Sequence, residues 1–177
     1  MISQSPSDNY LNQNVWREYM PHALRLLQDE RTVSLEGRYD LSRRVGLCLQ
    51  ADGRIADSVA RLEETYRWRK LHLPENDLSR LASQHELAIA YKANGQVKEA
   101  VWLLKQVVKI ESAMAEDGPS RFVSQHILAV AYQANGQVKE AVALLEQVIK
   151  IRSQTLAEDY PSRLISELAL ARLVSNE

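Results

Sequence analysis

Two histidines occupy matching positions in the sequence and are the first candidates for a chemical role. His85 and His126 both follow a Ser-Gln pair. An imidazole can act as a general base, ligate a metal or hydrogen-bond to a partner. Zinc sites use three or four ligands, and no acidic residue or cysteine is evidently placed beside both histidines, so a metal centre is disfavoured. A partner-binding role and a tolerated polar residue copied by duplication both stay open. A hydrolytic or metal-dependent enzyme using both histidines is the alternative from another functional class.

The other reactive side chains do not form a catalytic set. Cys48, the single cysteine, stands between two leucines, a setting typical of a buried and inert thiol. The carboxylates of Glu63, Glu64, Glu116 and Asp117 fall on expected exposed helix faces or in linkers, where nothing pairs them across a cleft. Because no nucleophile stands next to a base, we expect a non-enzymatic protein with no cofactor and no bound metal.

A glycine-containing segment occurs twice and could be a ligand loop or a structural joint. AYKANGQVKEA, from Ala90 to Ala100, returns as AYQANGQVKEA, from Ala131 to Ala141. A phosphate-binding loop needs several glycines followed by Gly-Lys-Ser/Thr, whereas a single glycine followed by Gln-Val stands here. Glycine after asparagine at the end of a helix is typical of a left-handed C-terminal cap. We therefore interpret the glycines as joints between helices.

These segments belong to a longer tandem duplication. Leu81–Ala113 aligns without a gap to Phe122–Gln154, with identical residues at 23 of 33 positions. A degraded earlier copy, Ala51–Glu64, is in phase with them, and AEDGPSR returns as AEDYPSR where a further copy begins. Repeats of this length indicate supersecondary units that stack on one another.

Within one copy, apolar residues recur at helical spacing. Val97, Ala100, Val101 and Leu104 follow the i, i+3, i+4, i+7 rule of an amphipathic helix. A shorter helix precedes the glycine, so each copy reads as helix, turn, helix. One helical hairpin cannot bury its own apolar stripe, so the hairpins should stack into an all-α, right-handed α-solenoid. Helices are predicted at residues 11–29, 38–51, 54–71, 78–93, 96–114, 120–134, 137–155 and 162–175.

The repeats define the expected domain organisation. Pro21 falls inside the first predicted helix, which should therefore kink or start afresh at Met20. The predicted segments are a disordered N-terminus at 1–10, an N-terminal helix region at 11–36, a degenerate repeat at 37–76, full repeats at 77–118 and 119–160, and the first helix of an incomplete repeat at 161–177.

Composition excludes several classes of partner. The 177 residues include 22 basic and 23 acidic side chains, interleaved along the chain, so no field favours nucleic acid or an anionic membrane. The polar N-terminus has no apolar stretch of the kind a signal peptide needs, and no run approaches the length of a membrane helix. We expect a cytoplasmic protein whose partner is another protein or a peptide.

The repeat motifs resemble those of the tetratricopeptide (TPR) family. That pattern, Leu-Gly-x-x-Tyr followed by Ala-x-x-x-Phe, is similar to Leu87-Ala88-x-x-Tyr91 with Ala100-x-x-x-Leu104 and to the same residues one copy later. The long period and the Glu-Asp-x-Pro linker resemble kinesin light chains. They are similar also to C-terminal arrays of fungal NLR-like proteins, in which a segment like Trp16 to Leu27 precedes the repeats. Leu78 departs from this pattern, because it stands where the linker proline is expected.

The resemblance implies a concave face that binds a peptide or protein. It also implies that both histidines lie on that face, and the mixed lining favours an extended or helical peptide with hydrophobic anchors. A sensor or autoinhibitory segment of an NLR-like protein is the alternative within this class. The implied partner-binding residues are Arg43, Leu47, Gln50, His85, Ile89, Lys92, His126, Val130, Gln133, Leu168 and Arg172, with Asp40, Ala82, Val123 and Ile165 on the same face.

Three further features of the helices have structural interpretations. The basic residues at 67, 69 and 70 complement the dipole at the end of their helix. Trp102 has alanine counterparts in the other copies, and we expect its indole to fill a local gap rather than mark an exposed contact. Apolar residues surround most of the last helix, 162–175, so either further repeats or a second copy of the chain should cover it.

Overall fold

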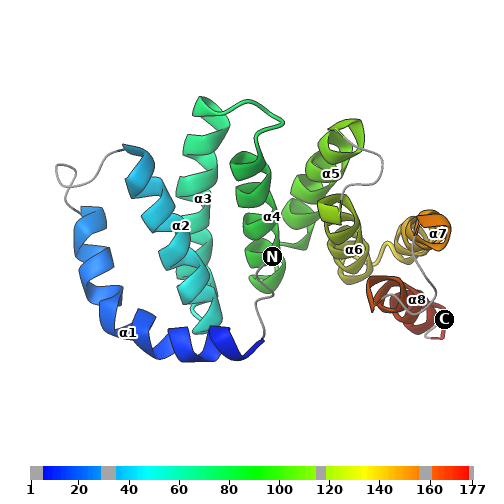
Figure 1. Ribbon diagram of the computed structural model, residues 1–177, viewed down its shortest axis with the longest axis horizontal. Helices are drawn as coiled ribbons and strands as arrows, with labels where there is room; N and C mark the ends of the chain where they lie inside the picture. Colours follow the sequence, from blue (N-terminus) through cyan, green and yellow to red (C-terminus); the bar gives the residue numbers. More distant parts are fainter. Residues whose placement is uncertain (1–5, 29–34, 115–118, 156–160, 176–177) are drawn as a thin grey trace. The chain divides into compact units, whose positions relative to one another are not determined.

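Two compact units make up the chain in the computed structural model, which describes residues 6–28, 35–114, 119–155 and 161–175. The first unit, Met1–Leu73, contains α1 (Pro6–Gln28), α2 (Leu35–Ala51) and α3 (Ile55–His72) (Figure 1). The second unit, Pro74–Glu177, contains α4 (Leu78–Ala93), α5 (Val97–Met114), α6 (Pro119–Ala134), α7 (Val138–Thr155) and α8 (Pro161–Val174).

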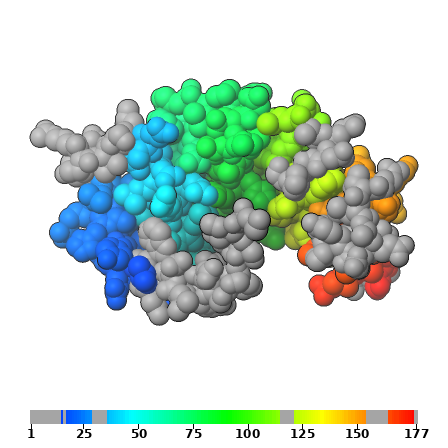
Figure 2. All heavy atoms as spheres, viewed as in Figure 1, coloured from blue at the N-terminus to red at the C-terminus, as the bar shows by residue number. Residues whose placement is uncertain are grey.

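The helices confirm the predicted fold class. Every element in the described residues is an α-helix, and α2–α3, α4–α5 and α6–α7 are hairpins whose two helices contact each other. Figure 2 shows the side chains of α2 and α3, in cyan to green, packed against one another. Apart from the first helix, the helix ends lie within three residues of the predicted ones. None of the described helices combines the length and hydropathy needed to cross a bilayer.

The first helix differs from its predicted extent. Helix α1 starts at Pro6, so residues 6–10, which were expected to be disordered, are helical, and residues 1–5 lie outside the described chain. Pro21 sits inside this one helix rather than at a new start, and the α1 ribbon changes direction along its length (Figure 1). A proline inside a helix removes one backbone hydrogen bond and its ring pushes on the preceding turn, which favours the bend.

The repeated glycines cap helices, as predicted. Gly95 and Gly136 have φ angles of +81° and +76°, in the left-handed region where a side chain is strained. After Gly95 the backbone N–H of Gln96 donates to the carbonyl of Tyr91 at 2.8 Å, which satisfies an otherwise unpaired carbonyl of the last turn. The same pattern recurs at Gly136, so both segments are joints between packed helices.

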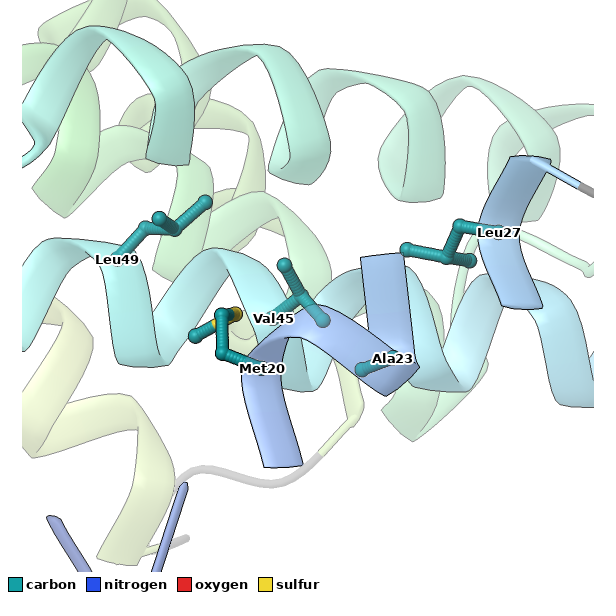
Figure 3. Packing of buried hydrophobic residues seen from close by; sticks show 5 residues of the cluster. All are labelled: Met20, Ala23, Leu27, Val45 and Leu49. Carbon is teal, nitrogen blue, oxygen red and sulfur yellow. The ribbon is translucent and has the colours of Figure 1, made fainter. Parts of the chain in front are cut away.

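The core of the first unit joins α1 to α2. Met20, Ala23 and Leu27 of α1 are buried together with Val45 and Leu49 of α2 (Figure 3). The positions 20, 23 and 27 follow the i, i+3, i+7 spacing of one helix face, so this part of α1 has a continuous apolar side to bury.

A glycine lets α2 and α3 approach closely. A Cβ atom added at Gly46 would lie 2.9 Å from Cγ of Leu62, closer than packed carbon atoms approach. Leu62 is fully buried. The absence of a side chain at Gly46 therefore allows this close packing of α3 on α2.

One buried cluster of the second unit runs through its last three helices. Ala129 of α6, Ala141 and Leu145 of α7, and Leu173 of α8 are buried in one cluster. The two alanines are at most 1% exposed, because the backbones of α6 and α7 come together at these small residues. Leu145 of α7 is clustered with Ala129 of α6 and Leu173 of α8, so it holds both of these helices against α7.

The junction that lacks a proline is capped by an aspartate. The side chain of Asp77 accepts hydrogen bonds from the backbone N–H groups of Ser79 and Arg80, at 2.8 and 3.1 Å. These are donors that the first turn of a helix leaves unpaired, and aspartate is a favoured N-cap residue. Helix α4 therefore starts at the predicted Leu78 without proline at that position.

Two charged residues of α3 contact α2. Arg69 lies in the last turn of α3, as predicted, but it is also 9% exposed and its Nη2 lies 3.6 Å from Oδ1 of Asp40, a contact that the sequence did not predict. Glu64 accepts a hydrogen bond from Ser42 at 3.0 Å and from Arg61 at 3.2 Å. Both contacts have one cause: the face of α3 that carries these residues packs on α2, so the expected exposure of Glu64 is corrected.

The interpretation of Trp102 is also wrong. Its side chain is 54% exposed and therefore does not fill a gap between helices. Leu103 and Leu104, the next two residues, take the buried positions of this turn.

Candidate functional site

A groove of about 450 Å³ lies between α6 and α8. Its floor consists of buried or partly buried apolar side chains from three helices, and its walls carry residues of mixed character. The floor residues are Ala129, Leu145, Ala169 and Leu173, and the wall residues are His126, Val130, Gln133, Ile165, Leu168 and Arg172.

Helical spacing places these walls opposite each other. Residues 126, 130 and 133 follow one another at i, i+4 and i+7 on α6, and residues 165, 168 and 172 at i, i+3 and i+7 on α8, so each set forms one row. Helix α7 packs against both helices and supplies Leu145 beneath the space between the rows. The groove is thus a product of the repeat packing itself.

The α8 wall offers accessible apolar surface. Ile165 and Leu168 are both 54% exposed, although each is a large aliphatic side chain. Contiguous exposed apolar surface beside polar groups is typical of a recognition site. These two residues are therefore available to a ligand without rearrangement of the core.

The α6 wall carries a neutral histidine. Burial lowers the pKa of His126, and the positive charges of Arg152 and Lys92 lower it further. At neutral pH the imidazole is therefore uncharged. Its Nδ1 atom is buried and has no hydrogen-bond partner among the described residues.

The second histidine lies one hairpin earlier. His85, Ile89 and Lys92 stand on α4, which contacts α6, and all three are partly buried. Burial lowers the pKa of His85, an effect that Glu86 partly offsets, and its Nε2 has no partner among the described residues. These three residues do not line the groove, but the charge of Lys92 reaches His126 across the two helices.

The remaining predicted residues belong to the other unit. Arg43, Leu47 and Gln50 stand on α2 and are partly exposed. Of the eleven predicted partner-binding residues, five line the groove, at 126, 130, 133, 168 and 172. The role of the whole set in binding stays a prediction.

Sequence reasoning missed a buried polar contact in the same three helices. Arg152 of α7 is 5% exposed, and its Nη1 donates to Oγ of Ser166 on α8 at 2.8 Å. Its guanidinium also lies 4.8 Å from the ring centre of Phe122 on α6. The contact therefore ties together the helices that form the groove. One signal was present, because Arg152 stands where the preceding copy has Glu111, on a helix face whose other residues are apolar.

The site is suited to binding and shows no assembled catalytic set. In the part of the chain that the structure describes, no group of three or more His, Cys, Asp or Glu side chains is placed to hold a metal. Burial raises the pKa of the Cys48 thiol, and the nearby Asp52 raises it further, so the reactive thiolate is disfavoured. The groove itself offers an imidazole, an amide and a guanidinium around aliphatic side chains.

Comparison with protein families matches the repeats. The tetratricopeptide repeat matches residues 80–119 and 123–161, which correspond to the hairpins α4–α5 and α6–α7. A search of curated protein sequences gave no match.

Solved structures with similar architecture cover nearly the whole chain. A protein from Podosopora anserina, described as a kinesin light chain with nearly identical TPR-like repeats, is 40% identical, with a TM-score of 0.78. A single-substitution variant of it is 39% identical, with a TM-score of 0.80. Each alignment covers 98% of this chain and 88% of the other. BtubC (BKLC) from P. vanneervenii, at 16% identity, covers 95% of this chain and 66% of its own, with a TM-score of 0.71, a likeness of fold alone.

Proposed function

This chain belongs to the tetratricopeptide-repeat family, whose repeats form non-enzymatic scaffolds for protein–protein binding, and from this premise we propose that its groove between α6 and α8 binds a peptide segment of a partner protein. The groove carries the proposal, because it combines an apolar floor with two rows of accessible side chains. Its volume of about 450 Å³ lies within the range of small ligand clefts, so it has room for a few side chains rather than a folded domain.

The wall residues suggest how a peptide would be held. Aliphatic or aromatic side chains of the peptide would contact Ile165, Leu168 and Val130, where burial of apolar surface supplies the affinity. His126 and Gln133 would hydrogen-bond to the peptide backbone and fix its direction. The adjoining row on α4, with His85, would extend the same surface.

Selection of short random peptides displayed on phage tests this proposal. We expect peptides with large apolar residues to be enriched on the immobilised chain. For a synthetic peptide from that set, Leu168→Asp should weaken binding about tenfold or more in fluorescence anisotropy, because a charge would face the apolar anchor.

The same helix provides a matched control. Leu164 is 49% exposed on α8 but does not line the groove, so Leu164→Asp should leave the peptide affinity of the monomeric chain unchanged. Equal loss in both variants, or in neither, would contradict groove binding. His126→Ala should weaken binding while the melting temperature stays within a few degrees, which separates a ligand contact from a folding role.

We also propose that α8 pairs with α8 of a second copy. Leu164, Ala171 and Val174 are exposed on α8. The counterparts of Leu164 and Ala171 on α6, Phe122 and Ala129, are buried, because there the next helix covers them. A two-fold contact between the same helix faces would cover this surface in both copies. Sedimentation velocity should detect a dimer that Val174→Glu dissociates, and a monomer at all concentrations tested would refute the pairing.

Two narrower predictions from the sequence stay predictions. The segment beginning at Trp16 motivates a role as a sensor or autoinhibitory part of a fungal NLR-like protein. Its test is whether the gene encodes a nucleotide-binding domain in the same reading frame. A cytoplasmic location is tested by imaging the tagged full-length protein in its source cell.

A further inference from the structure

The outer face of α5 carries an aromatic side chain surrounded by lysines. Trp102 is 54% exposed. Lys98, Lys105 and Lys109 stand four residues before it and three and seven residues after it, so all four side chains share one helix face. Each of these lysines is exposed. Together, Lys98, Trp102, Lys105 and Lys109 form what we call the Trp102 surface.

The next hairpin shows that folding does not require this surface. Helix α7 is a near copy of α5 of the same length, 18 residues, and it has the alanine Ala143 where α5 has Trp102. Glu146 takes the place of Lys105. The buried positions are unchanged, with Ala100 and Leu104 of α5 matched by alanine and leucine in α7.

On this face, α5 is more aromatic and more positively charged than α7. Replacing Ala143 and Glu146 of the copy by tryptophan and lysine adds a large aromatic group and removes a negative charge. Glu99 is the one carboxylate on the exposed face of α5 beside the Trp102 surface, so positive charge prevails there. The solvent-exposed part of the Trp102 indole gains nothing from folding, and tryptophan is among the residues enriched at interface hot spots.

We propose that the Trp102 surface binds an acidic segment of a protein partner, separately from the groove between α6 and α8. Carboxylates of the partner would pair with the lysines, while an apolar residue between them would cover the indole, whose Nε1–H can donate to a backbone carbonyl. A protein is favoured over a polyanion such as RNA, because three lysines beside a glutamate, on a chain of formal net charge −1, neutralise few phosphates.

The test uses a bait in which the groove is already disabled. Short random peptides displayed on phage would be selected on the full chain carrying Leu168→Asp, so that groove ligands do not enter the pool. We expect peptides with several Asp or Glu residues around an apolar residue. Trp102→Ala and Lys105→Glu, which restore the residues of the α7 copy, should each weaken a selected synthetic peptide about tenfold.

Helix α7 provides a gain-of-function control. Ala143→Trp combined with Glu146→Lys should rebuild the surface on α7 and raise the peptide stoichiometry from one to two per chain in calorimetry. Circular dichroism should show unchanged helicity for all these variants, because the substituted residues are exposed.

Several outcomes would overturn the proposal. It fails if selection on the Leu168→Asp bait enriches no acidic peptides, or if the enriched peptides bind the Trp102→Ala variant equally well. A short RNA, or vesicles containing phosphatidylserine, could instead bind more tightly than the selected peptides and lose this binding in the Trp102→Ala variant. In that case the Trp102 surface would be assigned to a nucleic acid or a membrane and not to an acidic protein segment. None of these results bears on the groove, whose peptides are selected on the chain with Leu168 intact and then compared between that chain and the Leu168→Asp variant.

Discussion

At the residue scale, Arg152 is the buried cation on which the packing of α6, α7 and α8 depends. It donates to Ser166 and lies over the ring of Phe122. We expect Arg152→Ala to lower the free energy of unfolding by about 2 kcal/mol, because it removes the contact and leaves the surrounding groups unpaired. Urea denaturation measures this value. Lys150→Ala, an exposed neighbour on the same helix, should change it by less than about 0.5 kcal/mol, and equal effects would contradict the role of Arg152.

The two histidines predict how stability depends on pH. Burial lowers the pKa of His85 and of His126 below the usual value of 6.5. As the pH falls through about 6.5, the unfolded state therefore binds protons before the folded state does, and the free energy of unfolding decreases. Above that pH both states are neutral and this stabilisation is complete. Urea denaturation at about pH 7.5 and about pH 5.5 should show the decrease.

Removing both imidazoles checks this assignment. In the His85→Asn/His126→Asn variant, the decrease between the two pH values should become smaller, since two groups with lowered pKa are gone. An unchanged pH dependence would mean that other groups account for it.

At the element scale, each hairpin depends on a glycine in the left-handed conformation. No atom lies within 4 Å of the Cβ that a substitution at Gly95 would add, so its cost is conformational and not steric. We expect Gly95→Ala to destabilise the chain by about 1 kcal/mol and Gly95→Asn by less, because asparagine tolerates this conformation better. Thermal or urea unfolding would measure the order Gly, Asn, Ala. An alanine variant as stable as the parent would contradict the observed φ of +81°.

At the scale of the whole molecule, the chain consists of two compact units. The exposed segment Pro74–Asn76 lies at their boundary. Because α4 to α8 pack in sequence on one another, we expect residues 74–177 to fold alone with a cooperative melting transition seen by circular dichroism. A fragment that is unfolded or melts gradually would show instead that the second unit needs the first.

The groove ligands also test the independence of the second unit. All residues that line the groove belong to this unit, so a peptide selected on the full chain should bind the fragment with similar affinity. A large loss of affinity in a folded fragment would place part of the binding surface in residues 1–73.

Much of this architecture follows from the sequence by itself. The duplicated segments gave the repeat period, the apolar spacing gave the helices, and Gly95 and Gly136 fell at turns because few other residues tolerate a positive φ. The rows at 126, 130, 133 and at 168, 172 were also predictable, because helical periodicity places such residues on one face.

Tertiary structure alone decided which side chains are buried and which are free. Arginine is a residue type that is mostly found at protein surfaces. Arg69 and Arg152 are nevertheless buried, because neighbouring helices cover them. Trp102 is a large apolar residue of the type expected in a core. It is nevertheless exposed, because its position on α5 faces away from the packed helices. The Leu145 floor of the groove likewise exists because α7 lies between α6 and α8. Periodicity assigns a residue to a face of its helix, whereas only packing between helices determines what that face meets.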